Sequence, residues 1–177
     1  ILFSDPDYCA TQGFVVAAGN PLGLHTFDDI AENSDAVLGV VSGGVEESYA
    51  EAAGVPGDRM TVFDTTVNIF EGLLDGRIDA VALTSITGNW QVKLLDDPSI
   101  EATEGFVPVI DGVEKFGCGG YGFRPENQAL RDAFNEELKK MKQNDEILPI
   151  VEIFGFTAAD VDQAKDVTVE DLTGGTE

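Results

Sequence analysis

The sequence predicts an α/β fold in which a mostly parallel β-sheet carries helices on both faces. The first observation is composition: 177 residues, 43% hydrophobic and 24% charged, suffice for one packed domain or two small lobes. The second is the alternation of short apolar runs with helical segments along the chain. The third is the presence of Thr and Gly where these helices should begin and end.

The first 95 residues carry this alternation. Short apolar runs predict strands at residues 13–18, 36–41, 60–63 and 78–83. Helices are predicted between and after them, at residues 27–32, 46–53, 65–74 and 86–95. Thr26 can cap the first helix and Thr65 or Thr66 the third, which Gly76 closes. A further strand is predicted at residues 106–110.

The last third of the chain is predicted to be mainly helical. A short strand at residues 121–123 leads to Pro125, which is compatible with the start of a long helix ending at about Gln143. Its apolar stripe consists of Leu130, Phe134, Leu138 and Met141. Further helices are predicted at residues 146–153 and after Thr157. From residue 166 the chain is acidic and rich in Gly and Thr, so a loose tail is expected.

The charge is strongly one-sided. The sequence has 33 Asp and Glu against 10 Lys and Arg, a net charge of −23. Nucleic acid and anionic membrane surfaces are excluded as partners, because both require clusters of Lys and Arg. A dispersed acidic excess is typical of halophilic proteins, in which salt screens the self-repulsion. The alternative is simply an acidic soluble protein.

Several functional classes lack their sequence signals. No apolar run of 18 residues is present, so no membrane span is expected. The two cysteines have no metal-site spacing, and His25 lies in a polar turn, so no metal or cofactor is expected. The chain begins at Ile1 without a signal peptide, and we expect it to start inside a larger protein.

The candidate site lies at the carboxyl ends of the predicted strands, where parallel sheets bind ligands. The loops at that edge begin at Ser42, Asp64 and Thr84. Residues 42–44 form a small-residue turn, which usually holds an anion through backbone N–H groups and the helix dipole. This chain instead places Glu46 and Glu47 in the first turn.

The two carboxylates have a functional and a plain interpretation. A carboxylate at this edge suits a cationic ligand group with N–H donors. Acidic residues also stabilise any helix N-terminus, by ~0.3–1 kcal/mol, whatever the function. Successive helix residues point about 100° apart, so only one of the two can face a ligand, and Glu46 is the stronger candidate.

Six segments in register resemble the amino-acid-type periplasmic solute-binding proteins of ABC transporters, over nearly the whole chain. They are Phe3–Tyr8 (FSDPDY), Gly19–Pro21 (GNP), Phe27–Ile30 (FDDI), Leu38–Gly43 (LGVVSG), Leu74–Val81 (LDGRIDAV) and Tyr121–Asp132 with the following helix and Phe154–Gly155. The resemblance implies the type II periplasmic-binding-protein fold, with two lobes and the ligand in the cleft between them.

The resemblance also implies a division of the chain. Residues 1–13 would be a crossover strand from the first lobe, 14–116 the second lobe, 117–165 the return to the first lobe, and 166–177 a flexible acidic tail. Most of the first lobe would be missing. Its helices, here without their sheet, should expose apolar surface.

At two positions where the family contacts an α-amino-acid ligand, this chain has a different residue. The Thr or Ser that holds the α-carboxylate is Gly44 here, and the Asp that holds the α-ammonium is Thr84. Residues 42–50 (SGGVEESYA) are similar to the ectoine/hydroxyectoine-binding branch, which implies that Glu46 pairs with the amidinium of ectoine. Gly43, Gly44 and Val45 would contribute backbone groups, Thr84 a strand-end hydroxyl, and Tyr8 a hinge-strand contact.

Alternatives stay open for these residues and for the function. Gly43 and Gly44 can be plain turn glycines, and Thr84 can cap the following helix. The ligand can instead be a polar or cationic amino acid. An enzyme on the same fold, such as a dehydratase, is disfavoured because a helix N-terminus should lower the pKa of Glu46. A sensory domain of a kinase is a further alternative.

The resemblance implies a monomeric, non-enzymatic component of an ABC importer. It would work in the periplasm or another extracytoplasmic space and deliver its solute to a membrane permease, which agrees with osmoprotection in a saline habitat. Cys9 and Cys118 both fall on the implied crossover segments. We expect them to form a disulfide there; the alternative is two small buried thiols.

Overall fold

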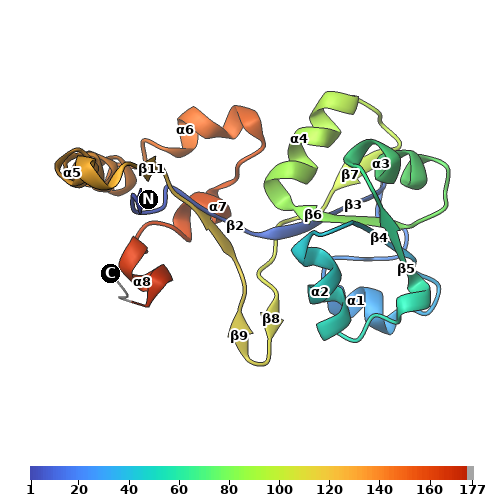
Figure 1. Cartoon of the computed structure of the whole chain (residues 1–177). Coiled ribbons are helices and arrows are strands. Elements are labelled where there is room, and N and C mark those ends of the chain that lie inside the picture. The colour runs from blue at the N-terminus through green and yellow to red at the C-terminus, as the bar shows by residue number, and fades with distance from the viewer. Residues whose placement is uncertain (175–177) are drawn as a thin grey trace. The chain divides into compact units, whose positions relative to one another are not determined.

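The computed structural model describes residues 1–174 and divides the chain into two compact units (Figure 1). Unit 2 runs from Thr11 to Phe116. Unit 1 combines Ile1–Ala10 with the chain from Gly117 onward. The chain therefore passes between units twice, within three residues of the expected lobe boundaries at 13/14 and 116/117.

Unit 2 is built on a five-stranded mixed sheet. Its strand order is β5 (Met60–Phe63), β4 (Leu38–Val41), β6 (Ala80–Thr84), β3 (Gln12–Ala17) and β7 (Ile100–Ala102). β4 pairs in parallel with β5 and β6, whereas β3 pairs antiparallel with β6 and β7. The expected parallel sheet is thus interrupted by β3, which enters with Gln12 opposite Thr84, the end of β6. A strand buried on both faces is a continuous apolar run whichever way it runs, so the sequence did not show that β3 is antiparallel to its neighbours.

Helices cover both faces of this sheet (Figure 1). α1 (Phe27–Glu32) and α2 (Val45–Ala52) lie on one face, and α3 (Thr66–Leu74) and α4 (Ser85–Leu95) on the other. Alternate residues of β3 pack into two hydrophobic cores, one on each face of the sheet. Phe14 and Val16 pack with α1, whereas Val15 packs with α3. Each helix lies within one residue of its expected range.

A β-hairpin lies where one strand was predicted at residues 106–110. β8 (Val109–Ile110) pairs with β9 (Val113–Glu114), and Phe106 makes an isolated bridge to Gln12. Asp111 and Gly112 connect the strands with φ values of +54° and +75°. Positive φ at both residues is typical of a type I′ hairpin turn, and the Asp-Gly pair was the sequence signal for it.

Unit 1 contains two short strand pairs and a group of helices. β1 (Leu2–Phe3) pairs with β11 (Gly122–Phe123), and β2 (Tyr8–Ala10) pairs with β10 (Gly117–Gly119). The remaining elements of unit 1 are η2 (Pro125–Asn127), α5 (Gln128–Gln143), α6 (Leu148–Val151), η3 (Glu152–Phe154), α7 (Ala158–Asp162) and α8 (Val169–Thr173). The numbering of these short 3₁₀ helices starts in unit 2 with η1 (Gly57–Arg59).

The core of unit 1 is small, and much apolar surface is exposed. Leu138, Ile147 and Val161 form the buried cluster. Leu130 and Ile150 are more than half exposed, at 59% and 56%. Apolar side chains of α5 and α6 therefore reach the surface of this unit.

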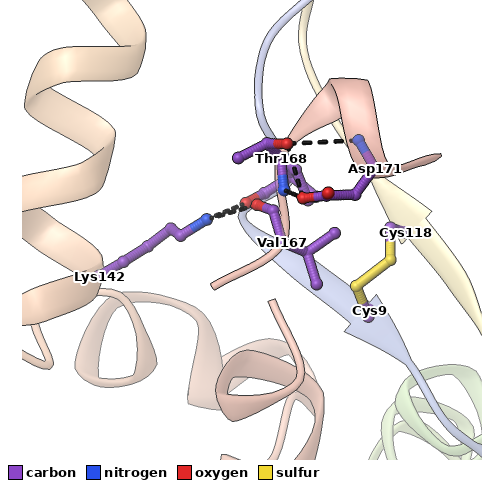
Figure 2. The surroundings of a disulfide bond; sticks show 7 residues. Cys9, Cys118, Lys142, Val167, Thr168 and Asp171 are labelled. Carbon is purple, nitrogen blue, oxygen red and sulfur yellow. Dashed lines mark hydrogen bonds between the residues drawn. A yellow bond between two sulfur atoms is a disulfide. The ribbon is translucent and has the colours of Figure 1, made fainter. Parts of the chain in front are cut away.

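The segment from residue 166 is folded as far as residue 174, which corrects the expected loose tail. Thr168 and Asp171 form a capping box that begins α8 (Figure 2). The Val169 N–H donates to Asp5 Oδ1 at 2.9 Å, and Lys142 Nζ donates to the Val167 carbonyl at 3.2 Å. These contacts order an acidic segment whose composition alone suggested a tail. Residues 175–177 of that prediction lie outside the described residues.

A disulfide joins Cys9 and Cys118 on the paired strands β2 and β10 (Figure 2). The two cysteines are directly opposite each other in the strand register. They lie 109 residues apart in sequence, and the loop that they close contains all of unit 2. Among residues 1–174, every helix is too short or too polar to cross a lipid bilayer.

Candidate ligand-binding site

The candidate site is the edge of the unit 2 sheet at which β4 ends and α2 begins. After Val41, the turn of residues 42–44 reverses the chain, with Gly43 at φ +78° and Gly44 as the N-cap of α2. The Ser42 N–H donates to the Phe63 carbonyl at 2.8 Å and the Gly44 N–H to the Val41 carbonyl at 3.0 Å. Two of the turn's amides are therefore used within the fold, which leaves fewer donors for an anion.

Glu46 is buried at this edge. It is the second residue of α2 and only 9% exposed, whereas the preceding Val45 is half exposed. Its carboxylate folds back over the turn, because a Cβ atom on Gly44 would lie 2.5 Å from Glu46 Oε2. Gly44 thus provides the space that the carboxylate occupies.

Gln12 contacts this carboxylate and was missed by sequence reasoning. It is the first residue of β3 and 3% exposed. One end of its side-chain amide faces two acceptors, Glu46 Oε1 at 3.2 Å and the Leu83 carbonyl at 3.1 Å. We assign the amide nitrogen to this end, because an amide oxygen there would face only acceptors, and the nitrogen then donates to both. A polar residue opening a buried strand was the only signal, and it did not indicate a partner.

The electrostatics of Glu46 differ from the expectation. Burial raises the pKa of its carboxyl, and a hydrogen bond from its own backbone N–H opposes this only in part. The expected lowering by the helix N-terminus is wrong in direction, because desolvation outweighs it. Burial also raises the pKa of Tyr49, and the charge of Glu46 adds to that rise. Within residues 1–174, no ion pair involves Glu46.

Thr84 is at the same edge, where it caps α4. Its Oγ1 accepts from the Thr87 N–H at 3.3 Å and donates to Thr87 Oγ1 at 2.8 Å. Beside it, the buried hydroxyls of Thr11 and Ser85 are 2.7 Å apart. Five predicted site residues all lie in unit 2, at the sheet edge where β4 and β6 end: Gly43 and Gly44 in the turn after β4, Val45 and Glu46 in the first turn of α2, and Thr84 at the end of β6.

Tyr8 belongs to unit 1. Its ring packs edge-on against Phe156, with centroids 5.1 Å apart. The ring also crosses Gly119, where an added Cβ atom would lie 2.3 Å from Tyr8 Cε1. Tyr8 is thus fixed within the β2–β10 ribbon of its own unit. Among residues 1–174, no cluster of three His, Cys, Asp or Glu side chains could hold a metal ion.

Comparison with known proteins indicates the class of protein. No family model matches the chain. A probable amino-acid ABC transporter periplasmic-binding protein of Sinorhizobium fredii is 27% identical over 172 residues, which are 97% of this chain and 56% of that protein. The histidine-binding periplasmic protein of Salmonella typhimurium is 26% identical over 144 residues, covering 80% of this chain and 53% of that protein.

Solved structures agree with these relatives. EhuB in complex with hydroxyectoine is 38% identical with a TM-score of 0.66, over 96% of this chain and 63% of that chain. An ancestral cationic amino acid solute-binding protein has a TM-score of 0.67 at 22% identity, over 88% of this chain and 62% of that chain. The chain spans a little over half the length of the curated relatives. The fold of the chain is that of the type II periplasmic-binding proteins, and its sequence is similar to the periplasmic-binding proteins of amino-acid ABC transporters.

Proposed function

We propose that this chain is part of the extracytoplasmic solute-binding component of an ABC importer, and that its ligand is ectoine or hydroxyectoine. The observation that carries the proposal is Glu46, a buried carboxylate without an ion-pair partner among residues 1–174, at the sheet edge where β4 and β6 end. The likeness to EhuB in complex with hydroxyectoine supports the choice of ligand. The ligand would be held by closure of two lobes and passed to a membrane permease.

The chemistry of the pairing follows from burial. A carboxylate removed from water is destabilised until a cation with N–H donors replaces the lost hydration. The amidinium of ectoine carries such donors on a delocalised positive charge, so its hydrogen bonds to Glu46 would be charge-assisted. Backbone groups of residues 43–45 and the Thr84 hydroxyl would contact the remainder of the ligand.

A polar or cationic amino acid is the second candidate ligand. The curated relatives are described as amino-acid- and histidine-binding proteins, which favours it. Glu46 could then bind a cationic side chain. The residue at position 84 counts against it. Thr84 has no carboxylate that could hold an α-ammonium, and its hydroxyl already caps α4.

An enzyme is the third candidate. The raised pKa of Glu46 suits a general acid, so the structure favours an enzyme more than the lowered pKa expected from the sequence did. The relatives in the comparisons are nevertheless solute-binding proteins. We therefore propose binding without turnover; conversion of a bound solute, followed by NMR of the ligand, would overturn this.

Calorimetric titration tests the ligand assignment. The protein, in the full length that its gene encodes, is titrated with ectoine, hydroxyectoine, arginine, histidine and glutamine. Hydrogen bonds to charged groups contribute about 1.5–3 kcal/mol, so Glu46→Gln should weaken ectoine binding roughly 10- to 100-fold. Glu47→Gln, one residue along α2, is the matched control and should bind ectoine normally. Ectoine binding unaffected by Glu46→Gln would return Glu46 to a helix-stabilising role, and preference for an amino acid would select the second candidate.

A further inference from the structure

We infer that Gln12 is a positioning residue, which holds the Glu46 carboxylate in the orientation that receives the ligand's N–H groups. The inference rests on the proposed function for the ligand, but the contact between the two side chains can be tested without one. Gln12 touches Glu46 and lies on a different element of unit 2, β3 rather than α2.

Gln12 is itself held rigidly. Its backbone N–H donates to the Phe106 carbonyl at 2.8 Å, and its carbonyl accepts from the Phe106 N–H at 2.7 Å. In the strand register it lies opposite Thr84 of β6, and on its other side it bridges Phe106, so its backbone is held from both sides. Its side-chain nitrogen donates to the Leu83 carbonyl of β6 at 3.1 Å. The amide is therefore anchored on backbone that cannot move independently of the sheet.

This anchoring leaves a single N–H for the carboxylate. A primary amide has two N–H donors; one is used on Leu83, and the other points to Glu46 Oε1 at 3.2 Å. The second carboxylate oxygen, Oε2, lies over Gly44. The two oxygens are thus fixed at different places, and Gln12 occupies only part of the acceptor capacity of the carboxylate. The remaining lone pairs are available to a ligand with paired N–H groups.

The contact also favours the charged form of Glu46. A hydrogen bond donated to a carboxylate stabilises its ionised state and so opposes the effect of burial. The sequence of β3, β4 and β6 contains no ionisable side chain. On α2, Glu47 and Glu51 neighbour Glu46 in sequence, and Tyr49 is the group whose pKa responds to its charge. Gln12 is therefore the neutral donor that can keep Glu46 ionised and ready for a cation.

NMR titration of the Glu46 side-chain carboxyl in the 177-residue chain tests the contact directly. Gln12→Met keeps the length of the side chain and removes both N–H donors. Because a hydrogen bond to a charged group is worth about 1.5–3 kcal/mol, the Glu46 pKa should rise by about one to two units. Gln91→Met on α4 is the control and should leave that pKa unchanged. An unchanged Glu46 pKa in a folded Gln12→Met protein would overturn the inference.

A second measurement needs no variant and so remains decisive if Gln12→Met does not fold. In the unaltered protein, the side-chain amide resonances of Gln12 should shift with pH at the midpoint of the Glu46 titration. If the chemical shifts of the Gln12 side-chain amide do not change at the pH where Glu46 titrates, the contact is overturned.

Ligand affinity separates this inference from the proposed function. If both hold, Gln12→Met should weaken ectoine binding and move the pH dependence of affinity to higher pH. Loss of binding in Glu46→Gln but not in Gln12→Met would defeat the positioning role and leave the proposed function standing. A shifted Glu46 pKa in Gln12→Met together with unaltered ectoine binding in Glu46→Gln would defeat the proposed function while the contact stands.

Discussion

At the scale of single residues, the site depends on a glycine as much as on a carboxylate. Glu46 is held over the turn because Gly44 has no side chain there. A carboxylate buried in this way is less stable ionised than it would be in water, as the raised pKa of Glu46 indicates. The fold thus retains a carboxylate whose burial disfavours folding in the ionised form.

Gly44→Ala tests this steric relation. An added Cβ atom would lie 2.5 Å from Glu46 Oε2 and 3.1 Å from the Val41 carbonyl, so the carboxylate must move. Overpacking of this kind costs about 1–3 kcal/mol, which urea unfolding would detect. Gly57→Ala is the matched control, because a Cβ atom there meets nothing within 4 Å. Equal stability of the two variants would show that Glu46 does not depend on the turn.

The pH dependence of stability gives a second prediction. The folded pKa of Glu46 lies above its ordinary value of 4.5, so the folded state binds this proton more tightly than the unfolded state. Glu46 therefore destabilises the fold increasingly as pH rises through that folded pKa. Glu46→Gln should raise the urea midpoint at pH 7, and the difference should disappear below about pH 4.5. A variant less stable than the parent at pH 7 would contradict the assigned burial.

At the scale of elements, local chemistry decided which predictions succeeded. α1 begins after Thr26, as its capping residue indicated, and Asp29 completes a capping box. Strand direction could not be read in the same way, because β3 is apolar on both faces whichever way it runs. The partner of Gln12 is equally invisible in sequence, since Gln12 and Glu46 lie 34 positions apart and only the sheet brings them together.

The capping of α1 can be tested by Thr26→Ala. The Thr26 hydroxyl accepts from the Asp29 N–H and donates to Asp29 Oδ2, and both contacts would be lost. N-cap removal costs about 0.5–2 kcal/mol, which should lower the urea midpoint measurably. Ser34→Ala, at an exposed position just beyond α1, is the control. No loss relative to that control would mean that packing of Phe27 and Ile30 alone holds the helix.

At the scale of the whole molecule, the Cys9–Cys118 disulfide ties together the two points at which the chain passes between units. The closed loop spans 109 residues of sequence separation. In the chain-entropy model, a cross-link over a loop of about 100 residues contributes roughly 4–5 kcal/mol, by restricting the unfolded chain. The large loop makes the disulfide a determinant of the stability of unit 2 as well as of the ribbon that contains it.

Thiol titration and reduction test this contribution. Titration under denaturing, non-reducing conditions should find no free thiol, and reduction should lower the urea midpoint substantially. The Cys9→Ser/Cys118→Ser double variant should match the reduced protein and be insensitive to reductant. Two free thiols in the untreated protein, or a midpoint indifferent to reduction, would contradict this account.

The most direct test of the central claim is the pKa of Glu46 with and without ectoine, measured by carbon-detected NMR in the full-length protein. A ligand cation paired with this carboxylate stabilises its ionised form, so saturating ectoine should lower the Glu46 pKa. By linkage, affinity for ectoine should then fall as pH falls through the raised pKa of the free protein. An ectoine-bound protein whose Glu46 titrates at the same pH as the free protein would contradict the pairing.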